Sequence, residues 1–88
     1  MAWKISFTKN ALKQLKKLDK PTARLVVGFL EEKIAGAPDA RKYGHALVGD
    51  RKGRWRYRIG DYRVLCELRD KQLLVVVITL GHRREIYR

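Results

Sequence analysis

The residues best suited to chemistry in this chain are arginines that alternate with aromatic side chains. Residues 54–58 read Arg-Trp-Arg-Tyr-Arg, and successive side chains of a β-strand point to opposite faces. Arg54, Arg56 and Arg58 would therefore share one face, while Trp55 and Tyr57 point the other way into packing. Because guanidinium is a planar, permanently charged donor that matches phosphate geometry, this pattern predicts a phosphate-binding surface.

Two more arginine-bearing segments follow. Arg63 comes directly after Tyr62, and residues 81–88 read Gly-His-Arg-Arg-Glu-Ile-Tyr-Arg. Acidic residues are scarce where these arginines are dense, which argues against a nuclease that uses a carboxylate pair or a carboxylate-bound metal. RNA supplies its own nucleophile, the 2′-hydroxyl, and arginines can neutralise the charge that builds on the scissile phosphate. DNA lacks this hydroxyl, so the residues favour cleavage of RNA.

The length of the chain and its net charge indicate how many domains it forms and what kind of partner it binds. The chain has 88 residues and a net charge of +12, which indicates one domain over residues 1–88 with a modest core. Such a charge favours nucleic acid as the partner, and an acidic protein next. No apolar run approaches the roughly 18 residues that a membrane span needs, and the first residues do not resemble a signal peptide. We therefore expect a cytoplasmic protein that does not act on membranes.

Cysteine and histidine usage excludes other kinds of site. A single cysteine, Cys66, excludes an internal disulfide, and we interpret it as a small buried hydrophobe. The two histidines lie in different segments, so no metal site is visible; His45 is expected to be structural or loop-exposed. The chain contains no glycine-rich phosphate loop and no Gly-x-Ser-x-Gly motif. We expect neither a metal nor a cofactor.

The first half of the sequence predicts a strand and two helices. Residues 2–7 alternate apolar and polar side chains, and Thr8 is a suitable N-cap for the helix that follows. Asp19-Lys20-Pro21 breaks that helix and begins a second one, which ends at Gly36-Ala37-Pro38. The predicted apolar stripes are Ala11, Leu12, Leu15 and Leu18 in the first helix, and Leu25, Val26, Phe29, Leu30 and Ile34 in the second.

The second half predicts a sheet. Residues 39–53 form mostly loop, with a short extended piece at 45–48, and strands follow at 54–59, 62–69 and 73–80. Their tight connections predict antiparallel hairpins. The last strand lacks polar alternation, so we expect it to be central and covered on both faces. The fold class is therefore α+β: an N-terminal strand, a two-helix hairpin, then a mainly antiparallel sheet.

Three segments together carry a family resemblance: residues 55–59 (Trp-Arg-Tyr-Arg-Ile), residues 61–65 (Asp-Tyr-Arg-Val-Leu) and residues 81–87. They resemble the RelE branch of the RelE/ParE superfamily, the toxins of type II toxin–antitoxin modules. The resemblance implies a fold likened to microbial ribonucleases and metal-independent cleavage of messenger RNA in the ribosomal A site, which inhibits translation. It also implies neutralisation by an acidic RelB-like antitoxin, through which alone the toxin would reach operator DNA.

The resemblance assigns roles to five residues. Arg56 and Arg58 match two basic residues of the family's central strand, and Arg63 matches the arginine that holds the phosphate. Arg83 would stabilise or protonate the leaving 5′-oxygen, and Tyr87 would stack on a base and orient the 2′-hydroxyl. We expect further RNA contacts from four residues: Lys52, Arg54, His82 and Arg84.

Several alternatives remain open at this level. The best-known member has lysines at the positions of Arg56 and Arg58. A guanidinium stays protonated, which argues against a neutral general base at these two positions. Whether His82 or an arginine acts as the general acid or base is left open. Glu67 is expected to orient Arg63 through a salt bridge. A ParE-like inhibitor of DNA gyrase without nuclease activity, and a non-catalytic nucleic-acid-binding module, are the competing functions.

Overall fold

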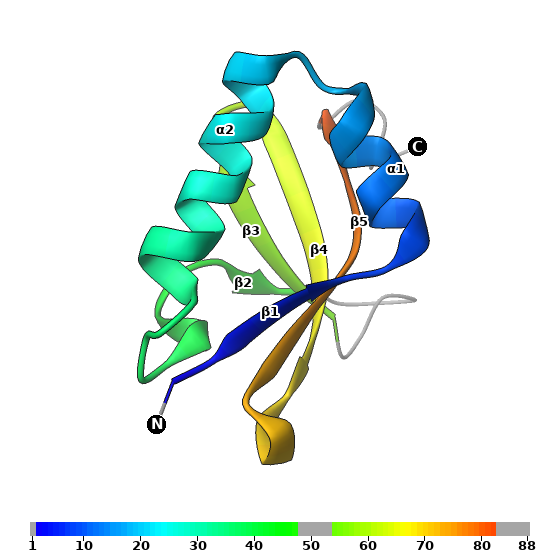
Figure 1. Ribbon diagram of the computed structural model, residues 1–88. Coiled ribbons are helices and arrows are strands. Elements are labelled where there is room, and N and C mark those ends of the chain that lie inside the picture. The colour runs from blue at the N-terminus through cyan, green and yellow to red at the C-terminus, as the bar shows by residue number, and fades with distance from the viewer. Residues whose placement is uncertain (1, 48–53, 83–88) are drawn as a thin grey trace.

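Two helices pack against one face of a β-sheet in the computed structural model, which describes residues 2–47 and 54–82 (Figure 1). In chain order the elements are β1 (Lys4–Phe7), α1 (Lys9–Lys17), α2 (Lys20–Phe29), a π-helical turn (Leu30–Ile34), a 3-10 turn (Ala40–Lys42), β2 (His45–Ala46), β3 (Trp55–Ile59), β4 (Tyr62–Arg69), another 3-10 turn (Asp70–Gln72) and β5 (Leu74–His82). This order confirms the predicted α+β fold. None of the helices in these residues is both long and apolar enough to cross a membrane.

The sheet is mixed. Within the described residues its five strands lie in the order β1-β5-β4-β3-β2. β1 pairs with β5 in parallel. The pairings of β3 with β4 and of β4 with β5 are antiparallel, as predicted, and β2 also pairs with β3 in the antiparallel sense. The two hairpins follow from the tight connections in the sequence, whereas the parallel pair requires the helices to carry the chain across the sheet.

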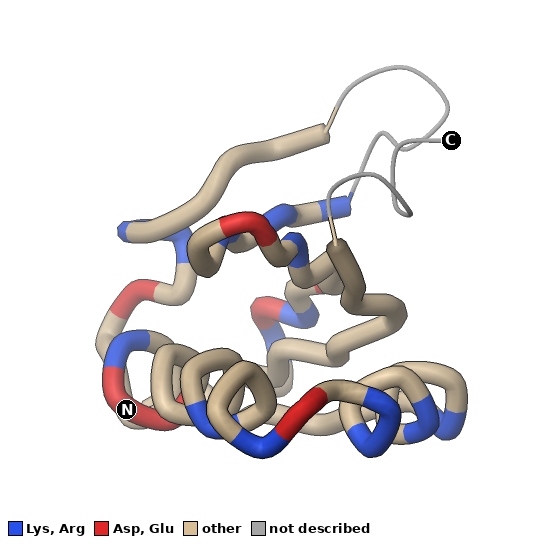
Figure 2. Tube along the Cα trace, turned by 90° about the horizontal axis from the view of Figure 1, so that it is seen from above, with Lys and Arg blue, Asp and Glu red and all other residues tan. Residues whose placement is uncertain are grey.

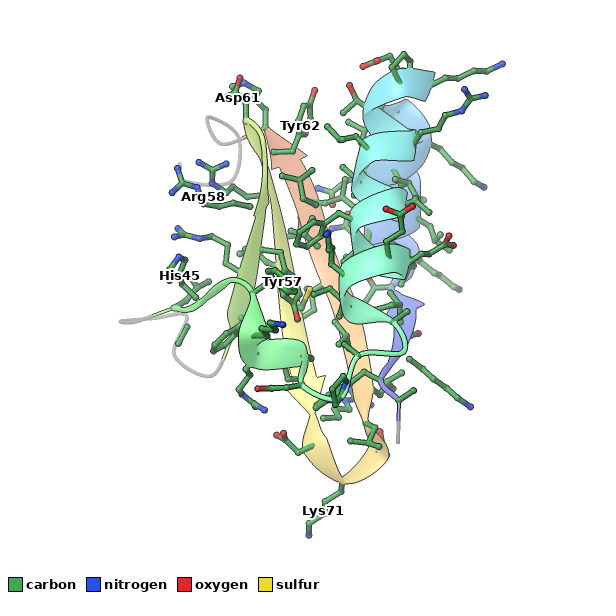
Figure 3. All side chains as sticks on the ribbon, turned by 90° about the vertical axis from the view of Figure 1, so that its left-hand side faces the viewer. His45, Tyr57, Arg58, Asp61, Tyr62 and Lys71 are labelled. Atoms are coloured by element: carbon green, nitrogen blue, oxygen red, sulfur yellow. The ribbon has the colours of Figure 1, made fainter. Side chains whose placement is uncertain are left out.

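The strand β5 departs from its prediction in two ways. It begins at Leu74, because Leu73 adopts a left-handed conformation with φ of 50° that ends the preceding turn. It lies between β1 and β4, but only its helix-facing side chains Val75, Val77 and Leu80 are buried, while Val76 is half-buried. Within the described residues both helices pack on the same side of the sheet (Figure 3), so for this part of the chain the expected coverage of both faces is wrong.

The helices begin where the sequence predicts, with Thr8 as the expected N-cap of the first and Asp19 as the N-cap of the second. The Thr8 hydroxyl accepts a hydrogen bond from the Ala11 amide at 3.1 Å, and the Asp19 carboxylate accepts one from the Thr22 amide at 3.2 Å. Such caps satisfy backbone donors that have no partner inside the helix. The predicted apolar stripes are only partly buried: Leu12 is 41% exposed and Leu25 is 57% exposed.

Beyond the end of β1, two side chains form hydrogen bonds with the last part of β5. They belong to Thr8, the N-cap of α1, and to Gln14 within α1. β1 ends its pairing at Val77, and beyond this point the Thr8 hydroxyl donates to the Ile78 carbonyl at 3.0 Å. The Gln14 Oε1 atom then accepts hydrogen bonds from the Thr79 hydroxyl and the Leu80 amide, both at 2.8 Å. α1 thus satisfies an edge that a longer β1 would otherwise have paired.

The core between the layers includes two groups that other proteins use in chemistry. Cys66 is fully buried, as expected, and burial raises the pKa of its thiol well above the ordinary value. The ring of Tyr57 lies 5.9 Å from that of Phe29, and its hydroxyl donates to the Ala40 carbonyl at 2.7 Å. Burial also raises the pKa of Tyr57. Both groups are therefore neutral packing elements at physiological pH.

Candidate nucleic-acid interface

The register of the sheet places the arginine row on the face away from the helices. Arg56 pairs with Leu65, and Arg58 pairs with Arg63, across β3 and β4. Paired residues share a face, so these three arginines lie on one side of the sheet. Figure 3 shows Arg58 on the side away from α2 and Tyr57 directed toward it.

Exposure differs strongly along this arginine face, the name used below for Arg56, Arg58 and Arg63. Arg58 is exposed and Arg56 is half-buried, whereas Arg63 is only 4% exposed. The Nη1 atom of Arg63 donates to the carbonyls of Gly60 and Tyr62 at 3.0 and 3.1 Å. A guanidinium held in this way by the β3–β4 turn is fixed in position before any ligand arrives.

Arg54 and Glu67 form an ion pair that the sequence did not predict. The Arg54 guanidinium lies 3.5 Å from the Glu67 carboxylate, which also contacts Arg69 at 3.3 Å. Glu67 was expected to orient Arg63, and that prediction is wrong. Arg63 and Glu67 are four positions apart on β4, about 13 Å along the strand axis, and the Arg63 guanidinium is instead bonded to the Gly60 and Tyr62 carbonyls. Glu67 therefore offsets the charge of Arg54 and not that of Arg63.

His82 lies on the opposite face from the arginines. It pairs with Tyr62 across β4 and β5, and their rings meet edge to face with centroids 5.7 Å apart. Tyr62 pairs in turn with Ile59 on the helix-facing side of the sheet. Together with Gln14 and Lys17, His82 lines a pocket of about 290 Å³ between the helical layer and the sheet end. Its strand position separates His82 from the arginine face, and its contact with RNA stays a prediction.

His45 is a residue that sequence reasoning did not assign to the site. It is exposed and pairs with Arg56 across β2 and β3, and Figure 3 shows it on the same side as Arg58. The extended piece predicted at 45–48 was the available signal, but its pairing partner could not be known from a two-residue strand. Four of the predicted site residues lie outside the described part of the chain: Lys52, Arg83, Arg84 and Tyr87.

The edge of the arginine face is held by close packing at β2. Gly44 has a φ of +85°, and a Cβ atom there would lie 2.3 Å from the Arg56 carbonyl oxygen. The Trp55 indole donates to the Tyr43 carbonyl at 2.8 Å. Beside it, Arg41 pairs with Asp70 at 2.5 and 3.0 Å and holds the pKa of that carboxyl below its usual range. These contacts give Trp55 the packing role that was expected.

This fold and its basic sheet face agree with a comparison of the chain with known protein families. The family model described as the ParE toxin of type II toxin–antitoxin systems, parDE, matches residues 5–87. The chain therefore belongs to the RelE/ParE family of type II toxin–antitoxin toxins. The resemblance seen in the sequence is confirmed.

Individual relatives lie mostly in the RelE branch. The chain is 31% identical to Toxin RelG of Mycobacterium tuberculosis over 88 residues, which cover 100% of this chain and 99% of that protein. It superposes with the crystal structure of the toxin–antitoxin complex RelBE2 from the same organism with a TM-score of 0.85 and 28% identity, covering 94% of this chain and 93% of that chain.

Two more distant structures share the fold. A doubly substituted E. coli toxin RelE in the free state matches with a TM-score of 0.77 and 24% identity, over 99% of this chain and 92% of that chain. The archaeal RelE–RelB complex from Pyrococcus horikoshii matches with a TM-score of 0.66 and 27% identity, over 94% of this chain and 97% of that chain.

Proposed function

We propose that this toxin is a ribosome-dependent endoribonuclease that cleaves messenger RNA in the A site and so inhibits translation. The observation that carries the proposal is the arginine face, where three guanidinium groups share one side of the sheet. Glu67, an acidic residue of β4, is paired with Arg54 and Arg69. A face with this excess of fixed positive charge suits a phosphate diester whose charge grows during cleavage.

The roles that we propose for the three arginines differ with their exposure to solvent. Arg58 is exposed and contacts the scissile phosphate, with Arg56 beside it. Arg63 is buried and bonded to two carbonyls through Nη1, so it acts as a fixed positive charge close to the phosphate. Charges in a poorly solvated position act more strongly on their neighbours than charges in water. Arg63 therefore adds transition-state stabilisation without reorganising.

The remaining chemistry is assigned to the C-terminal residues. In this proposal the 2′-hydroxyl attacks the phosphorus, Arg83 stabilises the leaving 5′-oxygen, and Tyr87 stacks on a base and orients the nucleophile. The guanidinium groups stay protonated and are poor general bases. The proposed reaction needs no metal ion, and Lys52 and Arg84 extend the contact with the RNA backbone.

The arginine face lacks a strong general base, and this is the reason for the proposed dependence on the ribosome. Positively charged side chains can bind RNA in many registers, and a reaction without a strong base gains most from exact placement of the nucleophile. Holding two reacting groups in place can lower a barrier by roughly 7–11 kcal/mol. We propose that the ribosome supplies this placement in the cytoplasm, and that naked RNA is bound with steep salt dependence but cut poorly.

A second part of the proposal is control by an acidic antitoxin. Two of the relatives above were solved as complexes with their antitoxins, and this chain carries a charge of +12. Its helices leave Leu12 and Leu25 exposed and form a groove of about 390 Å³ lined by Leu15, Ala23, Val27 and Gly28 among others. An amphipathic helix of a RelB-like partner fits such a groove. Operator DNA would be reached only through that partner.

The decisive experiment is induced expression followed by mapping of transcript ends against reading-frame position. Cuts inside translated messages support the nuclease, and they should disappear in Arg58→Ala and Arg83→Ala. Arg24→Ala removes an exposed arginine from α2 and should keep wild-type cleavage. Uncut messages together with gyrase-trapped, broken DNA would contradict the proposal. That outcome would favour the competing function, a ParE-like inhibitor of DNA gyrase without nuclease activity.

A further inference from the structure

A second basic surface lies on the opposite side of the molecule from the arginine face. α1 has the sequence Lys-Asn-Ala-Leu-Lys-Gln-Leu-Lys-Lys and contains no acidic residue. The side chains of Lys9, Lys13, Lys16 and Lys17 are all exposed. Figure 2 shows that basic positions occur in both the helical layer and the sheet layer. We call these four residues the α1 lysine stripe.

The stripe is continuous and its charge is not balanced locally. With 3.6 residues per turn, positions 9, 13 and 16 fall within about 60° of one another and span about 10 Å. The buried side of α1, with Ala11 at its centre, lies opposite. In the described part of the chain, no ion pair joins any of the four lysines to a carboxylate. The stripe therefore presents a straight row of ammonium groups to solvent.

A single RNA strand cannot occupy both basic surfaces. The arginine face and the helices lie on opposite sides of the sheet (Figure 3), so a strand on the arginines is separated from α1 by the sheet and the core. The surfaces also differ in chemistry: flexible lysines act as point charges, whereas arginines give directed, bidentate contacts. The stripe suits contacts with many phosphates and no fixed geometry.

We propose that the α1 lysine stripe is a second docking surface, for the phosphate backbone of folded, double-helical RNA. This inference rests on the proposed function, in which the toxin acts while surrounded by the folded RNA of a ribosome. The arginine face receives the strand that is cut, and the stripe holds a neighbouring RNA helix without reading its sequence. Duplex RNA is recognised mainly through its shape and phosphates, which a row of lysines can follow.

The test uses a 20-base-pair RNA duplex and measures how the affinity of the free toxin changes with salt. Each phosphate-contacting lysine that is removed should reduce the slope of log affinity against log salt by about one. The triple variant Lys9→Gln, Lys13→Gln, Lys16→Gln should therefore flatten the slope by about three. Circular dichroism checks that the variant remains folded, since all three side chains are exposed.

A triple variant with the same change in net charge serves as the matched control. It carries Gln at three exposed lysines outside α1, namely Lys33, Lys42 and Lys71. This control should keep a slope close to that of the wild type. If both triples flatten the slope equally, net charge alone explains the binding and the proposal is wrong. It is also wrong if the α1 triple keeps the wild-type slope and weakens only the complex with an acidic antitoxin segment.

A ribosome assay separates this inference from the nuclease proposal. The α1 triple should raise the ribosome concentration needed for half-maximal cleavage and leave the rate at saturation unchanged, whereas Arg58→Ala should lower the rate at saturation. If the wild-type toxin binds duplex RNA through the stripe but cleaves no message, the nuclease proposal fails and the docking surface stands. If cleavage occurs and the α1 triple needs no more ribosomes than the wild type, the docking surface is refuted.

Discussion

Arg58 and Arg63 lie directly opposite each other on β3 and β4. Arg58 is exposed to solvent, whereas Arg63 is buried and only 4% exposed. Like charges at such a cross-strand position repel each other. Hydrogen bonds from Arg63 to the Gly60 and Tyr62 carbonyls offset part of this cost. Two facing arginines lower the stability of the sheet, and unfavourable arrangements of this kind are often found at functional sites in proteins.

The two arginines should therefore respond differently to substitution. Arg58→Ala should reduce the cleavage rate about a hundredfold, because one lost transition-state charge contact costs about 3 kcal/mol, and should leave stability unchanged or slightly higher. Arg63→Ala should also abolish growth inhibition, but with a loss of about 1–3 kcal/mol of stability as buried hydrogen bonds disappear. Thermal unfolding and growth assays of both variants test this contrast. Equal stability of the two variants would contradict it.

Gly44 should be required for the edge of the arginine face. Gly44→Ala introduces a Cβ atom 2.3 Å from the Arg56 carbonyl oxygen at a φ of +85°, so β2 must move away from β3 and stability should fall by several kcal/mol. Gly60→Ala is the control, because its φ is +60° but nothing lies within 4 Å of the added atom. It should cost only about 1 kcal/mol. Chemical denaturation measures both, and similar losses would refute the packing argument.

Gln14 should stabilise the end of β5. The Leu80 amide and the Thr79 hydroxyl both donate to the Gln14 Oε1 atom at 2.8 Å. Gln14→Leu removes this acceptor and leaves the two partly buried donors without it. An unsatisfied buried group of this kind costs about 1–3 kcal/mol. Hydrogen exchange at the Leu80 amide should accelerate in step with the loss of stability. Gln72→Leu changes an exposed glutamine and should have no such effect; an unchanged Leu80 exchange rate in Gln14→Leu would show that the contact is dispensable.

Alkaline pH should destabilise the core through Tyr57. Burial raises the pKa of Tyr57 in the folded protein, so the folded state keeps a proton that the unfolded state releases above about pH 10. The contribution of Tyr57 to stability should be fully present below that pH and should decline as the pH rises beyond it. Tyr57→Phe should remove part of this decline, while losing about 1 kcal/mol with the hydrogen bond to Ala40.

The rest of the alkaline decline should come from Cys66, whose pKa burial also raises. Tyr43→Phe, a substitution of a half-buried tyrosine, should keep the wild-type decline and serves as the matched control. Urea unfolding between pH 8 and 11 provides the measurement. A wild-type decline retained in full by Tyr57→Phe would refute the assignment.

The sequence by itself determined the features that depend on neighbouring residues. The caps at Thr8 and Asp19 are read from residue type and position, because a cap bonds an amide two or three residues away. The shared face of Arg56 and Arg58 follows from the two-residue period of a strand. The hairpin from β3 to β4 follows from the short turn between them. These local rules were sufficient for the fold class and for the shared face of Arg56 and Arg58, whereas the place of Arg63 beside them depends on the pairing of β3 with β4.

Only the tertiary structure decided which charges are paired, buried or brought together. The burial of Arg63, the pairing of Glu67 with Arg54, and the approach of His45 to Arg56 depend on strand register and on turns between distant segments. His82 faces the helices because pairing with Tyr62 fixes its side of the sheet. Periodicity gives each strand two faces, but the packing of the helices on one of them determines which face becomes core and which remains available to RNA.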